Sequence, residues 1–299
     1  RMIGLWNLIK RNSKLFFKDK AMFFTSLITP LILLVLYATF LANVYRDSFT
    51  ASLPDSVQIS DRLIDATVGG ELFSSLLAVS CVTVAFCCNM TMVQDKAHGT
   101  RGDILVSPVK KSVLALSYYF STLISTLIVC FFATGICFVY LSRVGWYLSL
   151  SDVLLILLDV FLLVLFGTAL SSIINFFLSS QGQISAVGTV VSAGYGFICG
   201  AYMPISQFGD GLQKVLSFLP GTYGTSLLRN HALRGVFSEM SRVGFPAEVV
   251  EKIKDSIDCN LYFFSNKVEI STMFFILLLS IIALIGIYIL LNTLCKKNR

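Results

Sequence analysis

The most chemically varied stretch of the chain is a charged segment, DKAHGTRGDILVSPVKK, which runs from Asp95 to Lys111 between two long apolar segments. Thr100 is a candidate helix N-cap, and Asp103 stands three residues later, where a loose capping box places its acidic partner. Ser107-Pro108 then ends the helix, because the residue before a proline disfavours helical geometry. The spacing therefore predicts one short helix inside the charged segment.

The side chains of this short helix favour binding over catalysis. Ile104 and Leu105 form an apolar ridge, which suits docking of a soluble partner. A charged loop between two membrane spans is also commonly a passive connector, and the sequence leaves that alternative open.

Enzymatic chemistry finds little support elsewhere in the chain. No G-x-x-x-x-G-K-[ST] motif is present, so the chain has no P-loop for ATP phosphates. His98 and His231 are the two histidines, and neither belongs to a set of metal-ligand or catalytic spacing. We therefore expect no catalytic residue, no metal site and no cofactor bound by this chain.

Asp159 is a carboxylate placed well inside an apolar run. A charge at that depth is costly, so it marks a functional candidate. Two alternatives stay open, because the side chain can also reach the membrane interface or pair with Arg143.

Composition places the chain in a bilayer. Of its 299 residues 56% are hydrophobic and 13% are charged, whereas soluble domains have about 25% charged residues. Six apolar runs are long enough to cross the hydrocarbon, which takes about 20 residues. They are Met22–Val44, Val68–Val93, Val113–Leu141, Val153–Leu178, Ile184–Met203 and Ile270–Leu294. We predict an all-α integral membrane protein with six transmembrane helices.

The basic residues predict the orientation. Residues 1–21 form an amphipathic helix, with Leu5, Trp6, Ile9 and Phe16 on its apolar side, and precede a membrane domain at 22–299. With both termini cytoplasmic, the inner side holds thirteen of the 23 Lys and Arg residues. Three of them are in the tail, at Lys296, Lys297 and Arg299. This distribution explains the net charge of +6 without a nucleic-acid partner.

The segment at about 204–269 is predicted to be extracellular and structured. Its first part reads as two short helices, split at Pro220-Gly221, that dip into the outer leaflet. Pro246 then opens a small amphipathic helix. Its apolar face consists of Val249, Val250, Ile253 and Ile257.

The cysteines and small residues allow two readings each. Most of the eight cysteines lie in apolar runs, so we favour free thiols over a Cys199–Cys259 bridge. Gly196 and Gly200 form a GxxxG pair, for which we favour packing within the chain over a dimer face.

The charged segment and its surroundings resemble the permease subunits of the ABC-2 type export family. Those permeases carry a cytoplasmic loop, E-x-G-T-x-x-x-L-L-x-S-P, after the second span. Ala97 replaces the glutamate, so the acidic contact of the family is either missing or supplied by Asp95. Pro204 and the segment from Pro220 to Tyr223 match two later family features. The loop matches at Gly99, Thr100, Leu105, Ser107 and Pro108, with Ile104 at the first leucine position.

The resemblance implies a fold like that of type V, or ABCG-like, exporters. Two six-span permeases would pair as a homodimer or heterodimer, each resting on a separate cytoplasmic ATPase that binds ATP and Mg²⁺. Residues 1–21 would be the connecting helix, and residues at about 95–108 would be the coupling helix. The residues implied in ATPase coupling are His98, Gly99, Thr100, Arg101, Ile104, Leu105, Ser107 and Pro108.

The same resemblance implies a substrate pathway lined by the second and fifth spans. The implied cargo is amphiphilic, such as a drug, a peptide or a lipid-like molecule, and the alternative cargo is a polysaccharide or teichoic-acid-type glycan. Ordinary packing is an alternative role for the aromatic candidates. The pathway candidates are Phe73, Phe86, Asp159, Tyr195 and Phe197.

Three rival functions remain: an ATPase-independent transporter or channel, a membrane-embedded enzyme, and a regulatory subunit that only docks an ATPase. The first usually has intramembrane ionisable relays or inverted repeats, which we do not find. In every case we expect a multi-pass protein of a bacterial cell membrane, surrounded by lipid.

Overall fold

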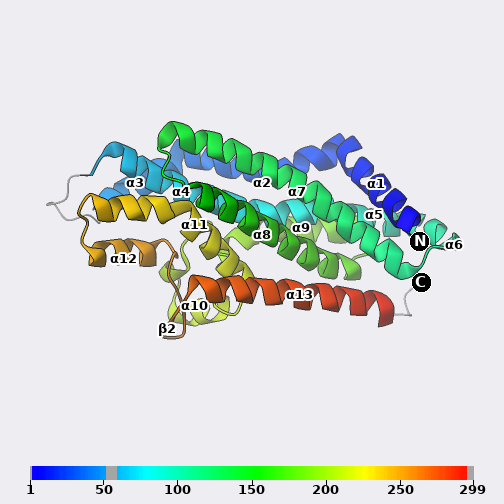
Figure 1. Ribbon diagram of the computed structural model, residues 1–299. Helices are drawn as coiled ribbons and strands as arrows, with labels where there is room; N and C mark the ends of the chain where they lie inside the picture. Colours follow the sequence, from blue (N-terminus) through cyan, green and yellow to red (C-terminus); the bar gives the residue numbers. More distant parts are fainter. Residues whose placement is uncertain (1, 52–58, 295–299) are drawn as a thin grey trace.

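The computed structural model describes residues 2–51 and 59–294, nearly all of them in helices (Figure 1). The first half contains α1 (Met2–Lys18), α2 (Lys20–Leu36), the π-helical turn η1 (Tyr37–Leu41), α3 (Ala42–Ala51), α4 (Asp61–Cys88), α5 (Met90–Ala97), α6 (Thr100–Val106) and α7 (Lys111–Val144). The second half contains α8 (Leu150–Phe177), α9 (Gln181–Ile198), the 3-10 turn η2 (Ile205–Gln207), α10 (Asp210–Leu216), α11 (Pro220–Arg242), α12 (Ala247–Ser256), β1 (Leu261–Phe263), β2 (Asn266–Val268) and α13 (Ile270–Leu294).

The long helices run side by side and give the molecule an elongated shape with two distinct ends (Figure 1). The start of α1, the short helix α6 and the last turns of α13 lie at one end, which we call the α6 end. Helices α3 and α12 lie at the opposite end, the α12 end. The predicted basic tail, Cys295 to Arg299, lies outside the described residues.

Four helical segments among the described residues are long and apolar enough to cross a membrane: Asp61–Ala97, α7, α8 and α13. The pair α1 and α2, bent by 74°, raises the number to five if it counts as one span. These segments confirm a multi-pass helical membrane protein, and the figure of six spans stays a prediction. A small antiparallel hairpin, β1–β2, is an addition that the sequence did not predict.

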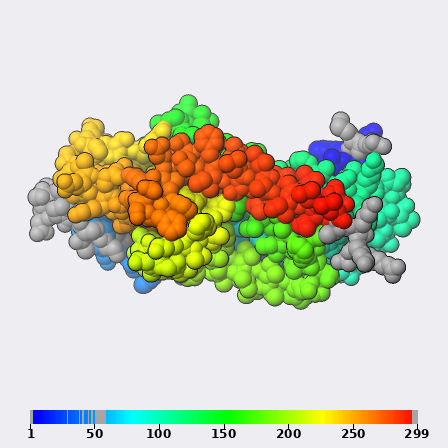
Figure 2. Space-filling model, turned by 90° about the horizontal axis from the view of Figure 1, so that it is seen from below, coloured from blue at the N-terminus to red at the C-terminus, as the bar shows by residue number. Residues whose placement is uncertain are grey.

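Helix α4 is the centre of the bundle. In its most apolar window 94% of the residues are buried, against 17% in α13. Figure 2 shows α13 along the surface of one face of the molecule, where its apolar side chains are exposed. This contrast is what a membrane protein requires, because lipid-facing helices expose apolar side chains while central helices pack against protein.

Small residues allow α4 and α8 to pack closely. A Cβ added at Gly167 of α8 would lie 2.8 Å from the Cys81 carbonyl oxygen and 2.9 Å from the Cα of Val82. Both of those atoms belong to the α4 backbone, so no side-chain rotation relieves the contact. Close backbone approach at small residues is a common way for helices to associate in membranes.

The N-terminal amphipathic helix is confirmed as α1, and its packing face includes only part of the predicted apolar side. Ile9, Asn12 and Phe16 are buried against the rest of the protein, whereas Trp6 is 61% exposed. The Asn12 amide lies 3.5 Å from the Ser117 hydroxyl of α7, so a polar contact rotates the buried face. The Asp19 side chain then caps α2 by accepting a hydrogen bond from the Met22 amide at 3.1 Å.

The long segment before α13 differs from the prediction in one respect. Its second helix is not short, because α11 extends for 23 residues from Pro220 and most of its side chains are buried. The helix opened by Pro246 is confirmed as α12, with Val250 and Ile253 buried. Pro220 suits the start of a long helix, since a proline at the first position loses no hydrogen bond.

Free thiols and within-chain glycine packing are both confirmed. Cys199 and Cys259 are buried and free. A Cβ at Gly196 would collide with the ring of Tyr202, and Gly200 has a φ of +76° beside Asp258. Gly196 therefore permits a close contact with Tyr202, and Gly200 permits the left-handed turn that follows α9.

Candidate coupling site and charged contacts of the bundle

The short helix α6 projects from the α6 end of the molecule (Figure 1). Its N-cap is Gly99, with a φ of +77°, and Thr100 is the first helical residue, so the predicted Thr100 capping box is wrong. A glycine suits this position because a left-handed backbone costs it least. At the other end the Ser107 hydroxyl donates to the Ile104 carbonyl at 2.5 Å, and Pro108 follows, as predicted.

The apolar residues of α6 divide into two groups. Ile104 and Leu105 are half-buried and pack against a small core formed by Met92, Leu114 and Tyr118. Val106 points the other way and is 88% exposed. The exposed apolar contact of this helix is therefore Val106, while the predicted ridge holds the helix to the bundle.

The polar candidates of the coupling site also lie at different depths. His98, Ser107 and Pro108 are exposed, whereas Thr100 and Arg101 are half-buried. Gly102 faces open space, since an added Cβ would meet no atom within 4 Å. The open surface of this site thus combines backbone, small side chains and Val106.

The base of α6 is held by the buried carboxylate of Asp95, at the end of α5. Arg11 of α1 donates to both of its oxygens, at 2.6 Å and 3.0 Å. The Tyr118 hydroxyl of α7 donates to one of them at 2.6 Å. Both oxygens of the Asp95 carboxylate thus accept hydrogen bonds within the chain. This carboxylate is therefore not free to substitute for the family's glutamate, whose position in this chain is taken by Ala97.

Lys96 ties α5 to the end of α8. Its ammonium group donates to the carbonyls of Asn175, Phe176 and Leu178 at 2.7–3.2 Å, and it lies 5.4 Å from the centre of the Phe176 ring. A cation at the C-terminus of a helix satisfies carbonyls that have no partner within the helix and interacts favourably with the helix dipole.

Asn89 makes a second contact with α8, farther from α6 than the contact of Lys96. The Asn89 amide, at the break between α4 and α5, donates to the hydroxyls of Ser171 and Ser172 at 3.0 Å. Asn175 donates back to the Asn89 carbonyl at 3.2 Å. A break in a buried helix leaves polar backbone groups, and these side chains satisfy one of them.

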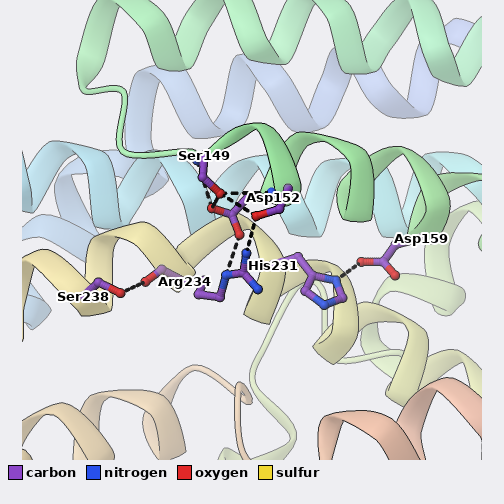
Figure 3. Close-up of polar contacts among 7 residues, drawn as sticks. Ser149, Asp152, Asp159, His231, Arg234 and Ser238 are labelled. Atoms are coloured by element: carbon purple, nitrogen blue, oxygen red, sulfur yellow. Dashed lines mark hydrogen bonds and ion pairs between the residues drawn. The ribbon is translucent and has the colours of Figure 1, made fainter.

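Near the α12 end, Asp159 of α8 pairs with His231 of α11 (Figure 3). Nδ1 of His231 lies 2.5 Å from Oδ2 of Asp159, and both side chains are almost fully buried. The alternative pairing of Asp159 with Arg143 is wrong, because Arg143 is exposed and His231 occupies the carboxylate.

Two turns away, Asp152 makes a second link between the same helices (Figure 3). Its carboxylate completes a capping box with Ser149 at the start of α8. Nε of Arg234 lies 2.6 Å from Oδ1 of Asp152, and Nη2 of Arg234 donates to the Ser151 hydroxyl at 2.8 Å. Two polar side-chain contacts, Asp159 with His231 and Asp152 with Arg234, therefore join α11 to α8.

Arg229 is a fully buried cation of α11. It donates to the Ser75 hydroxyl of α4 at 2.8 Å, and to the carbonyls of Ile257 and Gly200 at 2.6 Å and 3.2 Å. Asp258 accepts from the backbone amides of Ile205 and Ser206, so the connections around α10 and α12 meet at the same place.

Sequence reasoning missed Arg229 and the partner of Asp159 because it placed the start of α11 in short helices that dip into the outer leaflet, not in the core of the bundle. An available signal was the spacing of His231 and Arg234, which lie three residues apart and can share one side of a helix. Glu71 was a second missed charge, buried in α4 inside a predicted span.

The predicted pathway residues do not gather at one place. Phe197 lines a cavity of about 900 Å³ between α2, α9 and the break that follows α4. Phe73 lines a different groove, between α2, α4 and α7. Phe86, Asp159 and Tyr195 are buried within the bundle.

The β1–β2 hairpin carries its own charge cluster at the surface. Glu251 of α12 accepts from Lys267 of β2 and from Lys254, both at 2.9 Å. The hydrogen bond from Lys267, followed by that from Lys254, lowers the pKa of Glu251 to about 2. This carboxylate therefore stays charged over the whole physiological pH range.

Several long apolar helices packed into one bundle define a polytopic helical membrane protein. The sequence model of the ABC-2 type transporter family matches residues 4–232. The chain therefore belongs to the ABC-2 family of transport permeases. No curated protein matches the chain.

Proposed function

We propose that this chain is the membrane subunit of an ATP-driven exporter for an amphiphilic substrate, a drug, a peptide or a lipid-like molecule. A separate cytoplasmic ATPase, which binds ATP and Mg²⁺, docks on α6. The α6 end of the molecule then faces the cytoplasm, in accord with the predicted charge distribution.

The observation that carries this proposal is the construction of α6. Its base is fixed by the Arg11–Asp95–Tyr118 contacts, while Val106 and the Gly102 side face solvent. Burial of an exposed apolar side chain by a partner is favourable, and a rigidly held element loses little conformational freedom on binding. A loop that only connects two spans does not require an ion pair to another helix, such as that between Asp95 and Arg11 of α1.

Helix α8 is the element through which docking at α6 reaches the other end of the molecule. Lys96 holds its last carbonyls near α6, and Asp152 and Asp159 hold α11 near its start. A displacement of α5 and α6 by the ATPase would thus move α8 and α11 together, as a rigid-body step.

The cavity of about 900 Å³ supports an amphiphilic cargo. Its walls are mainly apolar, with hydroxyl groups from Thr25, Ser185, Thr189 and Ser192. Such a mixture, within the roughly 300–1,000 Å³ of known small-molecule sites, suits a molecule with one polar and one apolar part. A glycan exporter would need a more polar route, so it is the second candidate.

A second permease subunit, identical or related, is part of the proposal. Helix α9 presents Gly188, Ser192 and Ala193 to the cavity rather than to the bundle. Small residues permit the close approach of a facing helix. A pathway between two such faces would be completed by the second subunit.

The decisive experiment is co-purification of the permease with its ATPase after the substitution Val106→Asp. We expect the ATPase to be lost while the thermal unfolding midpoint of the permease is unchanged, because Val106 makes little contact within the chain. Val215→Asp, an exposed position on α10, is the matched control and should retain the ATPase.

Two results would contradict the proposal. One is an ATPase that stays bound to the Val106→Asp variant at the wild-type ratio. The other is transport by the isolated permease in liposomes without any ATPase, which would favour a secondary transporter or a channel.

A further inference from the structure

An apolar groove runs along the bundle between α2 and α7, with α4 as its floor. Its volume is about 480 Å³. Leu27 and Leu31 of α2 form one wall, Phe132 and Ala133 of α7 form the other, and Leu76 lies below them. No charged side chain of the described residues lines this groove.

The rim of the groove lies on the lipid-facing surface. Phe132 is 72% exposed, and Leu31 and Ile136 are exposed by about half. In a bilayer such positions contact hydrocarbon. If the groove were left empty, the side chains that line it would lose favourable dispersion contacts. The groove is therefore open to an acyl chain from the surrounding membrane.

One end of the groove is the elbow between α1 and α2. The rings of Phe17 and Phe23 lie 6.0 Å apart there, and both residues line the groove. Lys14 and Lys18 of α1 and Lys20 of α2 flank this elbow, and all three side chains are exposed. In the described part of the chain none of the three forms an ion pair.

The acidic residue at the elbow does not cancel this charge. The Asp19 carboxylate accepts a hydrogen bond from the Met22 amide as the N-cap of α2. Its negative charge offsets one of the three lysines, but the carboxylate is directed to the helix N-terminus, so the elbow stays positively charged and its ammonium groups stay available to an external anion. Cations at this depth attract the anionic headgroups of a leaflet.

We propose that the groove is a binding site for one anionic membrane phospholipid. An acyl chain lies between α2 and α7, and the phosphate lies against Lys14, Lys18 and Lys20. The charge at the elbow selects an anionic over a zwitterionic headgroup, while the groove holds the chain. This site is independent of ATPase docking and of the proposed cargo.

The test is native mass spectrometry of the full chain, purified in detergent and supplied with one of two lipids. The lipids are phosphatidylglycerol and phosphatidylcholine with the same acyl chains. We expect one phosphatidylglycerol per chain, bound about fivefold more than phosphatidylcholine, the ratio expected for roughly one effective lysine contact.

Two variants separate the parts of the site. Ala133→Phe fills the groove and should reduce binding of both lipids, whereas Leu279→Phe, on the lipid-facing side of α13, should not. The double variant Lys18→Gln/Lys20→Gln leaves only Lys14 at the elbow, so it should reduce the preference for phosphatidylglycerol and leave phosphatidylcholine binding unchanged. Its control is Lys214→Gln/Lys252→Gln, which removes two exposed cations elsewhere.

Equal binding of the two lipids to the wild type would overturn the proposal, as would undiminished binding to Ala133→Phe. If Ala133→Phe does not fold, Leu31→Phe fills the groove from the opposite wall, and undiminished lipid binding to that variant would overturn the proposal. Dimers whose contact, mapped by cross-linking, includes Ile136 would assign the groove to a second copy of the chain and also overturn it.

Discussion

Arg11, in the first helix, and Asp95, 84 residues later, form a two-fold hydrogen-bonded ion pair at the base of α6. The pair joins α1 to the segment that carries the proposed ATPase contact. Tyr118 adds a third helix to the same carboxylate. The N-terminal helix therefore contacts the base of the proposed coupling site directly.

Asp95→Asn should weaken this junction, because an amide cannot accept two charge-assisted bonds from a guanidinium. We expect a loss of roughly 1–3 kcal/mol in the free energy of unfolding, the typical cost of leaving a buried polar or charged group unsatisfied. Thermal unfolding in detergent measures the loss. The stimulation of the partner ATPase by the permease should decrease as well.

Asp103→Asn is the control for that substitution. Asp103 lies on the exposed side of α6 and has the same charge, so its unfolding midpoint should equal that of the wild type. Equal midpoints for Asp95→Asn and Asp103→Asn would show that the buried pair contributes nothing to stability.

Gly167→Ala should destabilise the protein although alanine is the better helix former. The new methyl group would lie within 3 Å of two α4 backbone atoms, so α4 and α8 must move apart. Overpacking of this kind costs about 1–3 kcal/mol. A lower midpoint of thermal unfolding is the expected result.

Gly135→Ala, in α7, separates packing from helix propensity. An added Cβ at Gly135 meets no atom within 4 Å. The substitution should therefore be neutral or stabilising, by up to about 1 kcal/mol. Destabilisation by Gly135→Ala equal to that by Gly167→Ala would refute the close-packing argument.

The sequence was sufficient for the membrane class, the amphipathic first helix and the position of α6, because hydropathy and charge act locally. It was insufficient for the capping of α6. Whether Gly99 or Thr100 becomes the N-cap depends on the backbone turn that brings α6 back against Leu114 and Tyr118. That turn is set by tertiary contacts, which a local pattern does not contain.

The partners of the charged residues within the bundle were even harder to predict from local sequence patterns. Asp159 was recognised as a functional candidate inside an apolar run, but its partner His231 lies 72 residues later, in a segment interpreted as short helices that dip into the outer leaflet. The mixed composition of α11 favoured that interpretation, since the partners of its polar residues lie in other elements, such as Ser75 of α4, Asp159 of α8 and the carbonyl of Ile257. Pairing across such distances follows from the fold and not from spacing.

Acid should weaken the β1–β2 hairpin. The hydrogen bonds from Lys267 and Lys254 lower the pKa of Glu251 from 4.5 to about 2. Their contribution is present above pH 4.5 and is lost as the pH falls through about 2. Because the carboxylate is 46% exposed, the contribution stays below about 1 kcal/mol.

Hydrogen exchange of the β1 and β2 amides measures this effect. In the wild type, protection should decrease as the pH is lowered from 4.5 towards 2, after correction for the intrinsic exchange rate. In Glu251→Gln, protection should be lower at pH 7 and constant over the same range. A wild-type pH dependence that persists in Glu251→Gln would assign the effect to another carboxylate.

The Asp159–His231 pair predicts a non-additive response to substitution. His231→Leu leaves the Asp159 carboxylate buried without its partner, and loss of one member of a buried pair costs about 3–5 kcal/mol. The cost should be high here, since Oδ1 of Asp159 already lacks a hydrogen-bond partner among the described residues. Asp159→Leu should cost less, because it removes the buried carboxylate, whose Oδ1 already lacks a partner among the described residues.

The double variant Asp159→Leu/His231→Leu should recover most of the stability lost in His231→Leu. It removes both polar groups from the contact between α8 and α11, and leucine packs well among their apolar neighbours. A double-mutant cycle of unfolding midpoints gives the coupling between the two positions. If the double variant is no more stable than His231→Leu, the two side chains do not act as a pair, and α11 is held to α8 by Asp152 and Arg234 alone.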